Sequence, residues 1–205
     1  MTQSARWFDV DPWQVTERRF DPQRYRMAEG VLALANGYMG QRASFEEGVT
    51  GAETLRGNYV AGVFDSYPNP QMIRLKGRPS HPKEMVNLPD HLPLLIEIDG
   101  HAIDLATWEV ESFERSLHLD GGVLRRTVTA NSPAGGRIRA EFTRFLSRTH
   151  RHIAATRVRL TALDAGGEAT VTSLIDGGVA NVRHRHFDVT GRIDGEDIHG
   201  LTART

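Results

Sequence analysis

The stretch "LPLLIEIDGHAIDL", residues 92–105, constrains the fold most, because it joins strand-like alternation to a tight turn. Leu94, Ile96 and Ile98 fall on one face of an extended segment, and the Asp-Gly pair at 99–100 follows directly. Asp-Gly between two β-patterned segments is a strong short-range signal for a β-hairpin. The stretch therefore predicts two antiparallel strands with one apolar face.

The same pattern recurs along the second half of the chain. "SLHLDGGVLRRTVTA", residues 116–130, repeats the strand–turn–strand device, and "GRIRAEFTRFLS", residues 136–147, alternates apolar with charged side chains. Residues 152–163 and 168–176 alternate in the same way. Short strands separated by regularly spaced turns are typical of an antiparallel sandwich or barrel. We predict an all-β fold.

Three segments depart from this pattern. Residues 23–36, "QRYRMAEGVLALAN", predict a short helix, although Gly30 weakens it by about 1 kcal/mol relative to alanine. Residues 66–93 contain six prolines and no sustained periodicity, which predicts a long surface excursion. Residues 191–205 predict a hairpin whose return strand has barely begun, so we expect the sandwich to be truncated at its C-terminal end.

Composition sets limits on function. The chain has 205 residues, a formal net charge of −1 and no cysteine. A near-neutral surface gives no long-range attraction for nucleic acid or anionic membranes, and the absence of cysteine excludes disulfides and thiolate chemistry. We find no signal-peptide pattern and no apolar run long enough to cross a membrane. We therefore expect a single cytoplasmic domain, 1–205, without nucleic-acid or membrane partners.

The loop "NGYMGQRASFEEG", residues 36–48, is the candidate functional segment. A glycosidase needs two carboxyl groups about 5 to 9.5 Å apart across the sugar, or one carboxyl group and an external nucleophile. Glu46 and Glu47 are adjacent, so in a strand they would point to opposite faces and would not form such a pair. We therefore favour a structural or solvated role for both glutamates; the alternative is that, in a loop, one of them contacts a ligand.

The rest of this loop predicts a structural or interface role. Asn36 and its neighbouring glycines are turn-formers, and Tyr38 and Met39 are expected to anchor the loop in the core. Arg42 is expected to form a charged brace with Glu46 or Glu47. The candidates for contact with a substrate rim or a domain interface are Asn36, Tyr38, Arg42, Glu46 and Glu47.

Two histidine pairs have the i, i+2 spacing that places both imidazoles on one face of a strand. They are His150 with His152 and His184 with His186, but arginines flank both pairs and no third ligand accompanies either. We therefore predict no metal site.

The three tryptophans, Trp7, Trp13 and Trp108, have side chains of the kind that stacks on sugar rings. The strand pattern around Trp108 favours burial in the core instead. The chain has no phosphate-binding loop, no serine elbow and no HExxH motif.

Several stretches in a fixed order resemble the N-terminal domain of glycoside hydrolase family 65, which includes maltose, trehalose and kojibiose phosphorylases. They are "FDPQRYRMAEGVLALANGYMGQRASFEEG", "GNYVAGVFD" and "VNLPDHLPLLIEIDG", and the resemblance runs from about Trp13 to Asn181. Two departures are Gly30, where relatives more often carry a side chain, and Ala43, where glycine is common. Neither departure conflicts with the family pattern.

The resemblance implies a large antiparallel β-sandwich of the super-sandwich, galactose-mutarotase-like type. In the family, an (α/α)6 barrel follows and carries the catalytic glutamate, a general acid, while inorganic phosphate attacks the anomeric carbon with inversion. That barrel is absent from this sequence, so the resemblance implies no catalytic residue here and no cofactor beyond phosphate as co-substrate. The implied partners are a disaccharide, the protein's own barrel and a second subunit in a homodimer.

Three functions are compatible with these observations. The first is a noncatalytic domain that packs on the barrel, supports dimerisation and lends a loop to the active-site rim. The second is a free-standing carbohydrate-binding module that uses Tyr38, Tyr59, Trp108 and the excursion 66–93 as a platform. The third is a structural interaction domain without sugar contact. An uncovered apolar patch would favour the first. The sequence leaves the disaccharide open, and also the choice between phosphate and water as acceptor.

Overall fold

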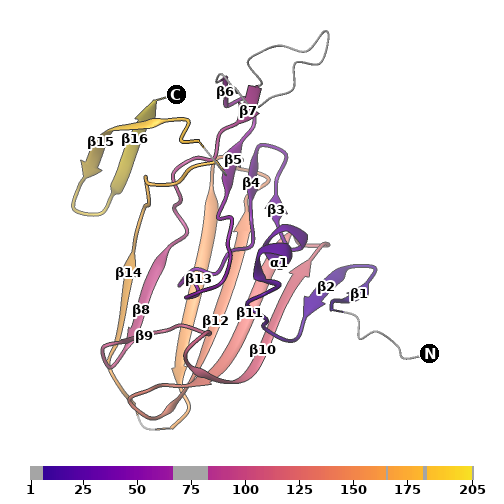
Figure 1. The fold of residues 1–205 in the computed structure, drawn as a ribbon, viewed down its shortest axis with the longest axis vertical. Coiled ribbons are helices and arrows are strands. Elements are labelled where there is room, and N and C mark those ends of the chain that lie inside the picture. Colours follow the sequence, from indigo (N-terminus) through magenta and orange to yellow (C-terminus); the bar gives the residue numbers. More distant parts are fainter. Residues whose placement is uncertain (1–6, 67–82, 165, 182–183, 205) are drawn as a thin grey trace.

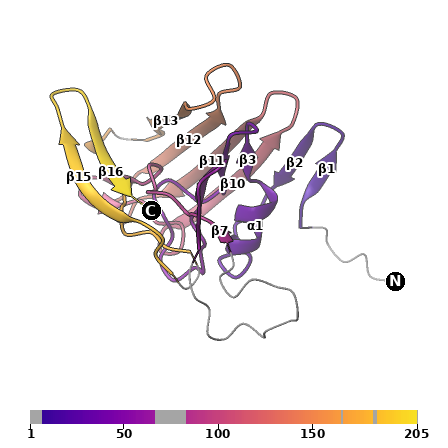
Figure 2. The same ribbon diagram turned by 90° about the horizontal axis from the view of Figure 1, so that it is seen from above.

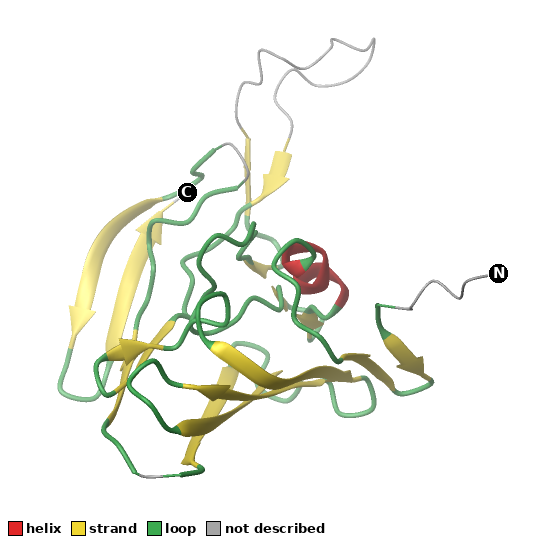
Figure 3. Cartoon of the chain, turned by 60° about the horizontal axis from the view of Figure 1, so that its bottom comes forward, coloured by secondary structure: helices red, strands yellow, loops and turns green. Residues whose placement is uncertain are grey.

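A computed structural model of the chain describes residues 7–66, 83–164, 166–181 and 184–204. Over these residues the chain consists almost entirely of antiparallel strands and loops, arranged as two packed layers (Figures 1 and 3). None of the helices in this part of the chain is long and apolar enough to cross a bilayer. The predicted all-β sandwich is confirmed.

Six strands form the larger layer, in the order β1-β2-β10-β11-β12-β13. They are β1 (Asp9–Asp11), β2 (Gln14–Glu17), β10 (Glu109–His118), β11 (Val123–Asn131), β12 (Arg137–Leu146) and β13 (Ala154–Ala162). These strands lie side by side in Figure 2, and a bulge interrupts the register of β10 between Val110 and Ser112. This large sheet carries most of the core.

Shorter elements cover one face of the large sheet. One group is a three-stranded sheet in the order β14-β8-β9, and the other is a three-stranded sheet in the order β3-β4-β5 together with the helix α1. Their bounds are β14 (Ala169–Ser173), β8 (Leu94–Ile98), β9 (His101–Ala102), β3 (Leu34–Ala35), β4 (Met39–Gln41), β5 (Asn58–Val60) and α1 (Tyr25–Val31). In Figure 2, α1 and β3 lie on the same side of the large sheet.

Two hairpins complete the described chain. One is β6 (Phe64–Ser66) with β7 (Lys83–Met85), and the other is β15 (Asp188–Asp194) with β16 (His199–Arg204). β16 has six residues paired with β15, so the expectation of a barely begun return strand is wrong.

The predicted excursion 66–93 is only partly described, because residues 67–82 lie outside the described residues. Its second part is not a surface segment. Val86, Asn87, Asp90 and Leu92 are all buried there, so this half of the prediction is wrong.

The hairpin predicted at residues 99–100 is confirmed. Asp99 and Gly100 have φ angles of 50° and 77°, and they join β8 to β9. Both central residues of a type I′ turn need positive φ, which asparagine, aspartate and glycine tolerate best. The predicted helix is also present, but α1 is shorter than the segment 23–36 and includes Gly30 in its last turn.

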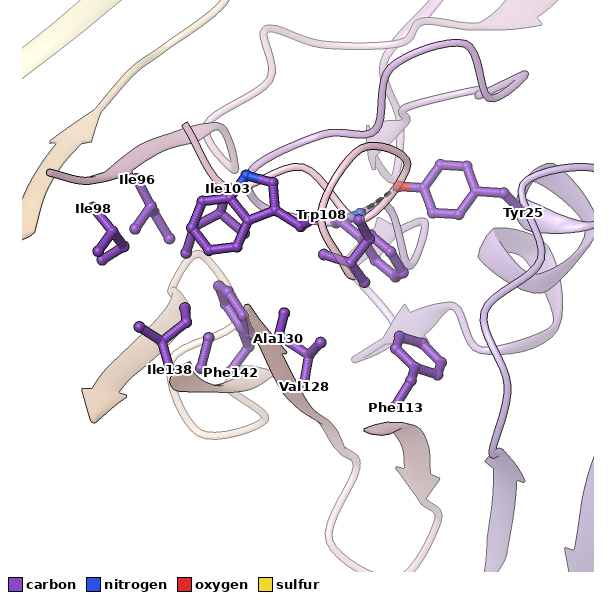
Figure 4. Packing of buried hydrophobic residues seen from close by; sticks show 13 residues of the cluster. Tyr25, Ile96, Ile98, Ile103, Trp108, Phe113, Val128, Ala130, Ile138 and Phe142 are labelled. Atoms are coloured by element: carbon purple, nitrogen blue, oxygen red, sulfur yellow. Dashed lines mark hydrogen bonds between the residues drawn. The ribbon is translucent and has the colours of Figure 1, made fainter. Parts of the chain in front are cut away.

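Alternation along the long strands places the core where the sequence predicts it. In β12, Ile138, Ala140 and Phe142 are buried while Arg137 and Arg139 are exposed. The larger of two apolar clusters joins the large sheet to β8 and α1 (Figure 4). It contains Tyr25, Phe45, Ile96, Ile98, Ile103, Leu105, Trp108, Phe113, Val128, Ala130, Ile138, Ala140 and Phe142. The smaller cluster contains Leu32, Leu34, Ala43, Leu117, Leu124 and Leu146.

Candidate functional site

A row of buried arginines crosses the inner face of the large sheet. Arg115 on β10 lies opposite Arg126 on β11 and opposite Glu17 on β2. Arg126 lies opposite Phe142 on β12, and Arg144 is two residues further along β12, so it shares this face. All three arginines are at most 3% exposed. Positions that alternation assigns to apolar side chains therefore carry three positive charges.

The candidate loop neutralises the middle arginine. Arg126 Nη1 donates a hydrogen bond to Glu47 Oε1 at 2.6 Å, and Arg126 Nη2 donates one to Glu46 Oε2 at 2.8 Å. The Arg126 guanidinium also lies between two aromatic rings, 4.0 Å from the centroid of Phe45 and 3.9 Å from that of Phe142. Each of these contacts favours the cation, and together they offset the cost of removing it from water.

Glu46 and Glu47 lie in a bend rather than a strand. Their side chains therefore converge on one guanidinium instead of pointing to opposite faces. The Glu46 and Glu47 side chains are 2% and 1% exposed in these ion pairs. This burial is consistent with the predicted structural role of both glutamates.

The flanking arginines are also paired. Arg115 Nη2 donates to Glu17 Oε2 at 2.7 Å, and Arg115 Nη1 donates to the backbone oxygen of Ala43 at 2.7 Å. Arg144 Nε lies 3.2 Å from Glu46 Oε1, but Arg144 Nη1 has no hydrogen-bond partner among the described residues. Three arginines thus face three glutamates, and Arg144 is the least satisfied member of the row.

Burial and charge act against each other on these groups. Burial alone raises the pKa of Glu46, but the attraction of Arg144 and Arg126 outweighs it and lowers the pKa below its usual range. Burial lowers the pKa of Arg144; Glu46 opposes this shift, while Arg126 adds to it by repulsion. A carboxylate held ionised by two guanidinium groups has no proton to donate, so Glu46 cannot act as a general acid near neutral pH.

This pKa shift predicts where acid destabilises the fold. The pKa of Glu46 is lower in the folded state than in the unfolded chain, so its stabilising contribution is present above the unfolded pKa, about 4.3. That contribution is lost as the pH falls through the lower, folded pKa. We expect the free energy of unfolding, measured in urea from neutral pH to strongly acidic buffer, to fall on the acid side. The fall should be shallower in Glu46→Gln. Parallel curves for the two proteins would contradict the assignment.

Asn36 holds the start of the candidate loop. Its Oδ1 accepts hydrogen bonds from the backbone N–H groups of Tyr38 and Met39 at 3.0 and 2.7 Å. Its Nδ2 donates to the backbone oxygens of Ser147 and Arg151 at 2.7 and 3.1 Å. One side chain therefore closes the tight turn and ties it to the connection between β12 and β13.

Tyr38 and Met39 take different positions. Met39 packs against the smaller apolar cluster, as predicted. The Tyr38 ring instead lies against the β12–β13 connection, 4.5 Å from the ring centroid of His152 and 4.7 Å from the guanidinium of Arg151. The expected anchoring in the core is therefore confirmed for Met39 and wrong for Tyr38.

Arg42 does not form the predicted brace with Glu46 or Glu47. Its Nη2 donates to the backbone oxygen of Arg26 at 2.8 Å and lies 3.7 Å from the carboxylate of Glu29. Gly30 makes room for this side chain, because a Cβ atom there would lie 3.3 Å from Arg42 Nη1. The predicted brace is therefore wrong, and Glu46 and Glu47 pair with the buried Arg126 instead.

A second polar network fixes the segment after β7. Asp90 accepts hydrogen bonds from Arg56 Nε at 2.6 Å and from Asn58 Nδ2 at 2.7 Å. Gln41 Nε2 donates to Asn58 Oδ1 at 2.8 Å, which extends the network to β4. The side chain of Asn87 reaches the backbone oxygens of Arg56 and Ala180. These bonds explain why the proline-rich segment ends in the interior.

Neither histidine pair lies on a strand. His150 and His152 are exposed in the β12–β13 connection, whereas His186 is buried with Nδ1 at 2.9 Å from Asp65 and Nε2 at 3.5 Å from Glu84. Within residues 7–66, 83–164, 166–181 and 184–204, no group of three histidine or acidic side chains could hold a metal ion.

Of the expected sugar-stacking platform, residues 67–82 lie outside the described residues, and Trp108 is not available for stacking. Trp108 is only 6% exposed and belongs to the larger cluster, as the strand pattern predicts. Tyr38 packs on the β12–β13 connection, and Tyr59 is half-buried. Trp13 is 64% exposed, at the turn between β1 and β2.

Sequence reasoning missed Glu17, Glu29 and the arginine row. A signal for the row was available, because the inward alternation of Ile138, Ala140 and Phe142 continues to Arg144. A charged residue at an inward position of a strand indicates a buried ion pair. Glu29 had no such signal, since its partners Leu55 and Thr54 come from a loop.

Comparison with known proteins identifies the family. Residues 15–203 match the model "Glycosyl hydrolase family 65, N-terminal domain". The chain is 32% identical to a maltose phosphorylase from Bacillus subtilis over 181 residues, 87% of this chain and 23% of that protein. It is 33% identical to a kojibiose phosphorylase from Halothermothrix orenii over 175 residues, 85% of this chain and 21% of that protein.

A solved structure confirms the fold. The chain superposes on a putative kojibiose phosphorylase from the human microbiome with a TM-score of 0.87 at 21% identity, covering 98% of this chain and 26% of that one. This chain thus spans about a quarter or less of the proteins that it matches. The chain belongs to glycosyl hydrolase family 65, of which it represents the N-terminal domain.

Proposed function

We propose that this chain is the noncatalytic N-terminal domain of an enzyme that cleaves α-linked glucosyl disaccharides by inverting phosphorolysis. The match to the family's N-terminal domain over residues 15–203 carries this proposal, and the names of the relatives suggest maltose, kojibiose or trehalose as substrate. In this scheme a glutamate of the catalytic domain protonates the glycosidic oxygen while phosphate attacks the anomeric carbon. The present chain supplies a rigid partner for that domain.

The ion pairs of the candidate loop support a noncatalytic role. Glu46 and Glu47 are both committed to Arg126, and Glu46 is also held ionised by Arg144. A loop fixed in this way offers a stiff surface rather than a proton donor. Asn36, Tyr38 and Arg42 lie on the same segment and are proposed to contact the catalytic domain or the rim of its active site.

Uncovered apolar side chains support packing on another domain. Phe64 and Met85 are directly opposite each other on the β6–β7 hairpin and are 50% and 42% exposed. Met27 and Val31, one turn apart on α1, are exposed on its outward face. Exposed apolar groups of this kind are typical of interaction surfaces. We propose that the catalytic domain and a second subunit cover them.

Two assays test this function. The chain alone, given maltose, trehalose or kojibiose with inorganic phosphate, should release no glucose 1-phosphate; appreciable turnover would overturn the noncatalytic assignment. A chimera in which this chain replaces the matching segment of the Bacillus subtilis maltose phosphorylase should retain phosphorolysis. The same enzyme without its N-terminal segment should lose it. A folded but inactive chimera would contradict the supporting role.

A further inference from the structure

A cleft lies where the chain leaves the large sheet at the end of β2. β2 pairs with β10 only over Arg115–His118, and the chain then turns away through residues 18–20. The space between this segment, the edge of β10 and the turn before it has a volume of about 390 Å³. Its lining residues are Arg18, Arg19, Phe20, Leu105, Trp108 and 110–113. This volume lies within the range of about 300–1,000 Å³ found for small-molecule sites.

The β10 edge at this cleft is not a template for another strand. Residues 109–114 pair with β11 on one side and have no strand partner on the other among the described residues. Their backbone N–H and C=O groups on that side are therefore available for hydrogen bonds. The bulge between Val110 and Ser112 breaks the regular spacing that an added strand would need. This arrangement favours a small ligand over an extended peptide.

The charges of the cleft are largely balanced. Arg18 pairs with Asp9 at 2.7 Å and also with Glu114, while Glu111 lies 3.7 Å from Arg137. A site built for a phosphate or a carboxylate would instead present unpaired cations. The balanced charges favour an uncharged ligand with many hydrogen-bonding groups.

One cation keeps its donors available. The Arg19 guanidinium stacks on the Trp7 ring, 5.0 Å from its centroid, and forms no ion pair with the described residues. Ser112 adds an exposed hydroxyl group on the β10 edge. Hydroxyl groups of a ligand are suitable partners for both side chains.

Apolar groups form the inner wall of the cleft. Phe20 is partly buried against the larger cluster, and Trp108 and Phe113 also line the cleft. Phe20 contacts Phe113 at a centroid distance of 6.0 Å, so its ring is held in place. A pyranose ring fits such a wall, because it is uncharged and combines an apolar face with several hydroxyl groups.

We propose that this cleft binds one pyranose unit of a neutral glucoside. The sugar's apolar face packs on Phe20, and its hydroxyl groups bond to Arg19, Ser112 and the free edge of β10. This site is independent of the noncatalytic function proposed above. The cleft can bind sugar whether or not the chain supports a phosphorylase.

The test compares a cleft variant with a matched surface variant. Ser112→Trp fills the cleft from an exposed strand position, and Ser173→Trp adds the same side chain at an exposed position on β14. Maltose is titrated into each ¹⁵N-labelled protein while backbone amide shifts are followed by NMR. We expect shifts at residues 18–20 and 110–113 in the parent chain and in Ser173→Trp. Ser112→Trp should bind at least about tenfold more weakly.

Several results would overturn the proposal. One is the absence of maltose-dependent shifts at the cleft in the parent chain, and another is equal affinity in the two tryptophan variants. Inorganic phosphate should cause no comparable shifts, so a stronger response to phosphate than to maltose would assign the cleft to an anion instead. Binding of an extended peptide in preference to maltose would likewise contradict it.

Discussion

Replacing Arg126 with methionine is expected to lower the free energy of unfolding by about 3–5 kcal/mol, because the change leaves Glu47 buried without its cation and removes one of the two cations that face Glu46. Glu46 and Glu47 both bond to this guanidinium, and the Arg126 side chain is 3% exposed. Small domains are stable by only about 5–15 kcal/mol, so the loss is a large share of the total. Urea unfolding followed by circular dichroism measures it.

The adjacent arginine provides the matched control for this experiment. Arg125 is exposed on the opposite face of β11, so Arg125→Met should change stability by no more than about 0.5 kcal/mol. Combining Arg126→Met with Glu47→Gln should recover much of the loss, because Glu46 keeps Arg144 as its counterion and no uncompensated charge then remains. This combination also tests the idea if Arg126→Met alone does not fold. Equal effects of the two methionine substitutions would contradict the buried pairing.

Trp108→Ala should cost about 3–5 kcal/mol, the usual loss when a large aromatic side chain leaves a core. The side chain packs in the larger cluster between β8 and the large sheet, so its removal leaves a cavity (Figure 4). Trp13→Ala is the control, because Trp13 is 64% exposed and should change stability by less than about 0.5 kcal/mol. A loss of stability in Trp108→Ala as small as that in Trp13→Ala would contradict the core position of Trp108.

The strands and their faces were the part of the fold that could be predicted. Alternation determines which side chains of β12 face inward, and the Asp-Gly pair determines where β8 turns back. Both signals are local, because they depend on a repeat of two residues and on the positive φ angles of one turn. The family resemblance independently agrees with this architecture.

The partners of buried charges were not predictable in the same way. The expected brace joined Arg42 to Glu46 or Glu47 because these residues are close in sequence. In the folded chain Arg126 is 80 residues from Glu46, and Arg42 turns back to Glu29. Such pairs depend on the packing of one layer on another, which a single sequence does not reveal. The surface position predicted for the proline-rich segment was wrong for the same reason. Asp90 is held inside by Asn58 on β5 and by Arg56, just before β5.

The arginine row has a consequence for how the molecule unfolds. It lies between the two apolar clusters and joins β2, the candidate loop, β10, β11 and β12, which are far apart in sequence. Local opening of either cluster would separate a buried ion from its counterion in a poorly hydrated interior. Partial opening therefore has a high free-energy cost. We therefore expect amide hydrogens on both sides of the row to exchange at a common, slow rate. The buried charges lie between two apolar clusters, and they would make both clusters unfold together as one cooperative unit.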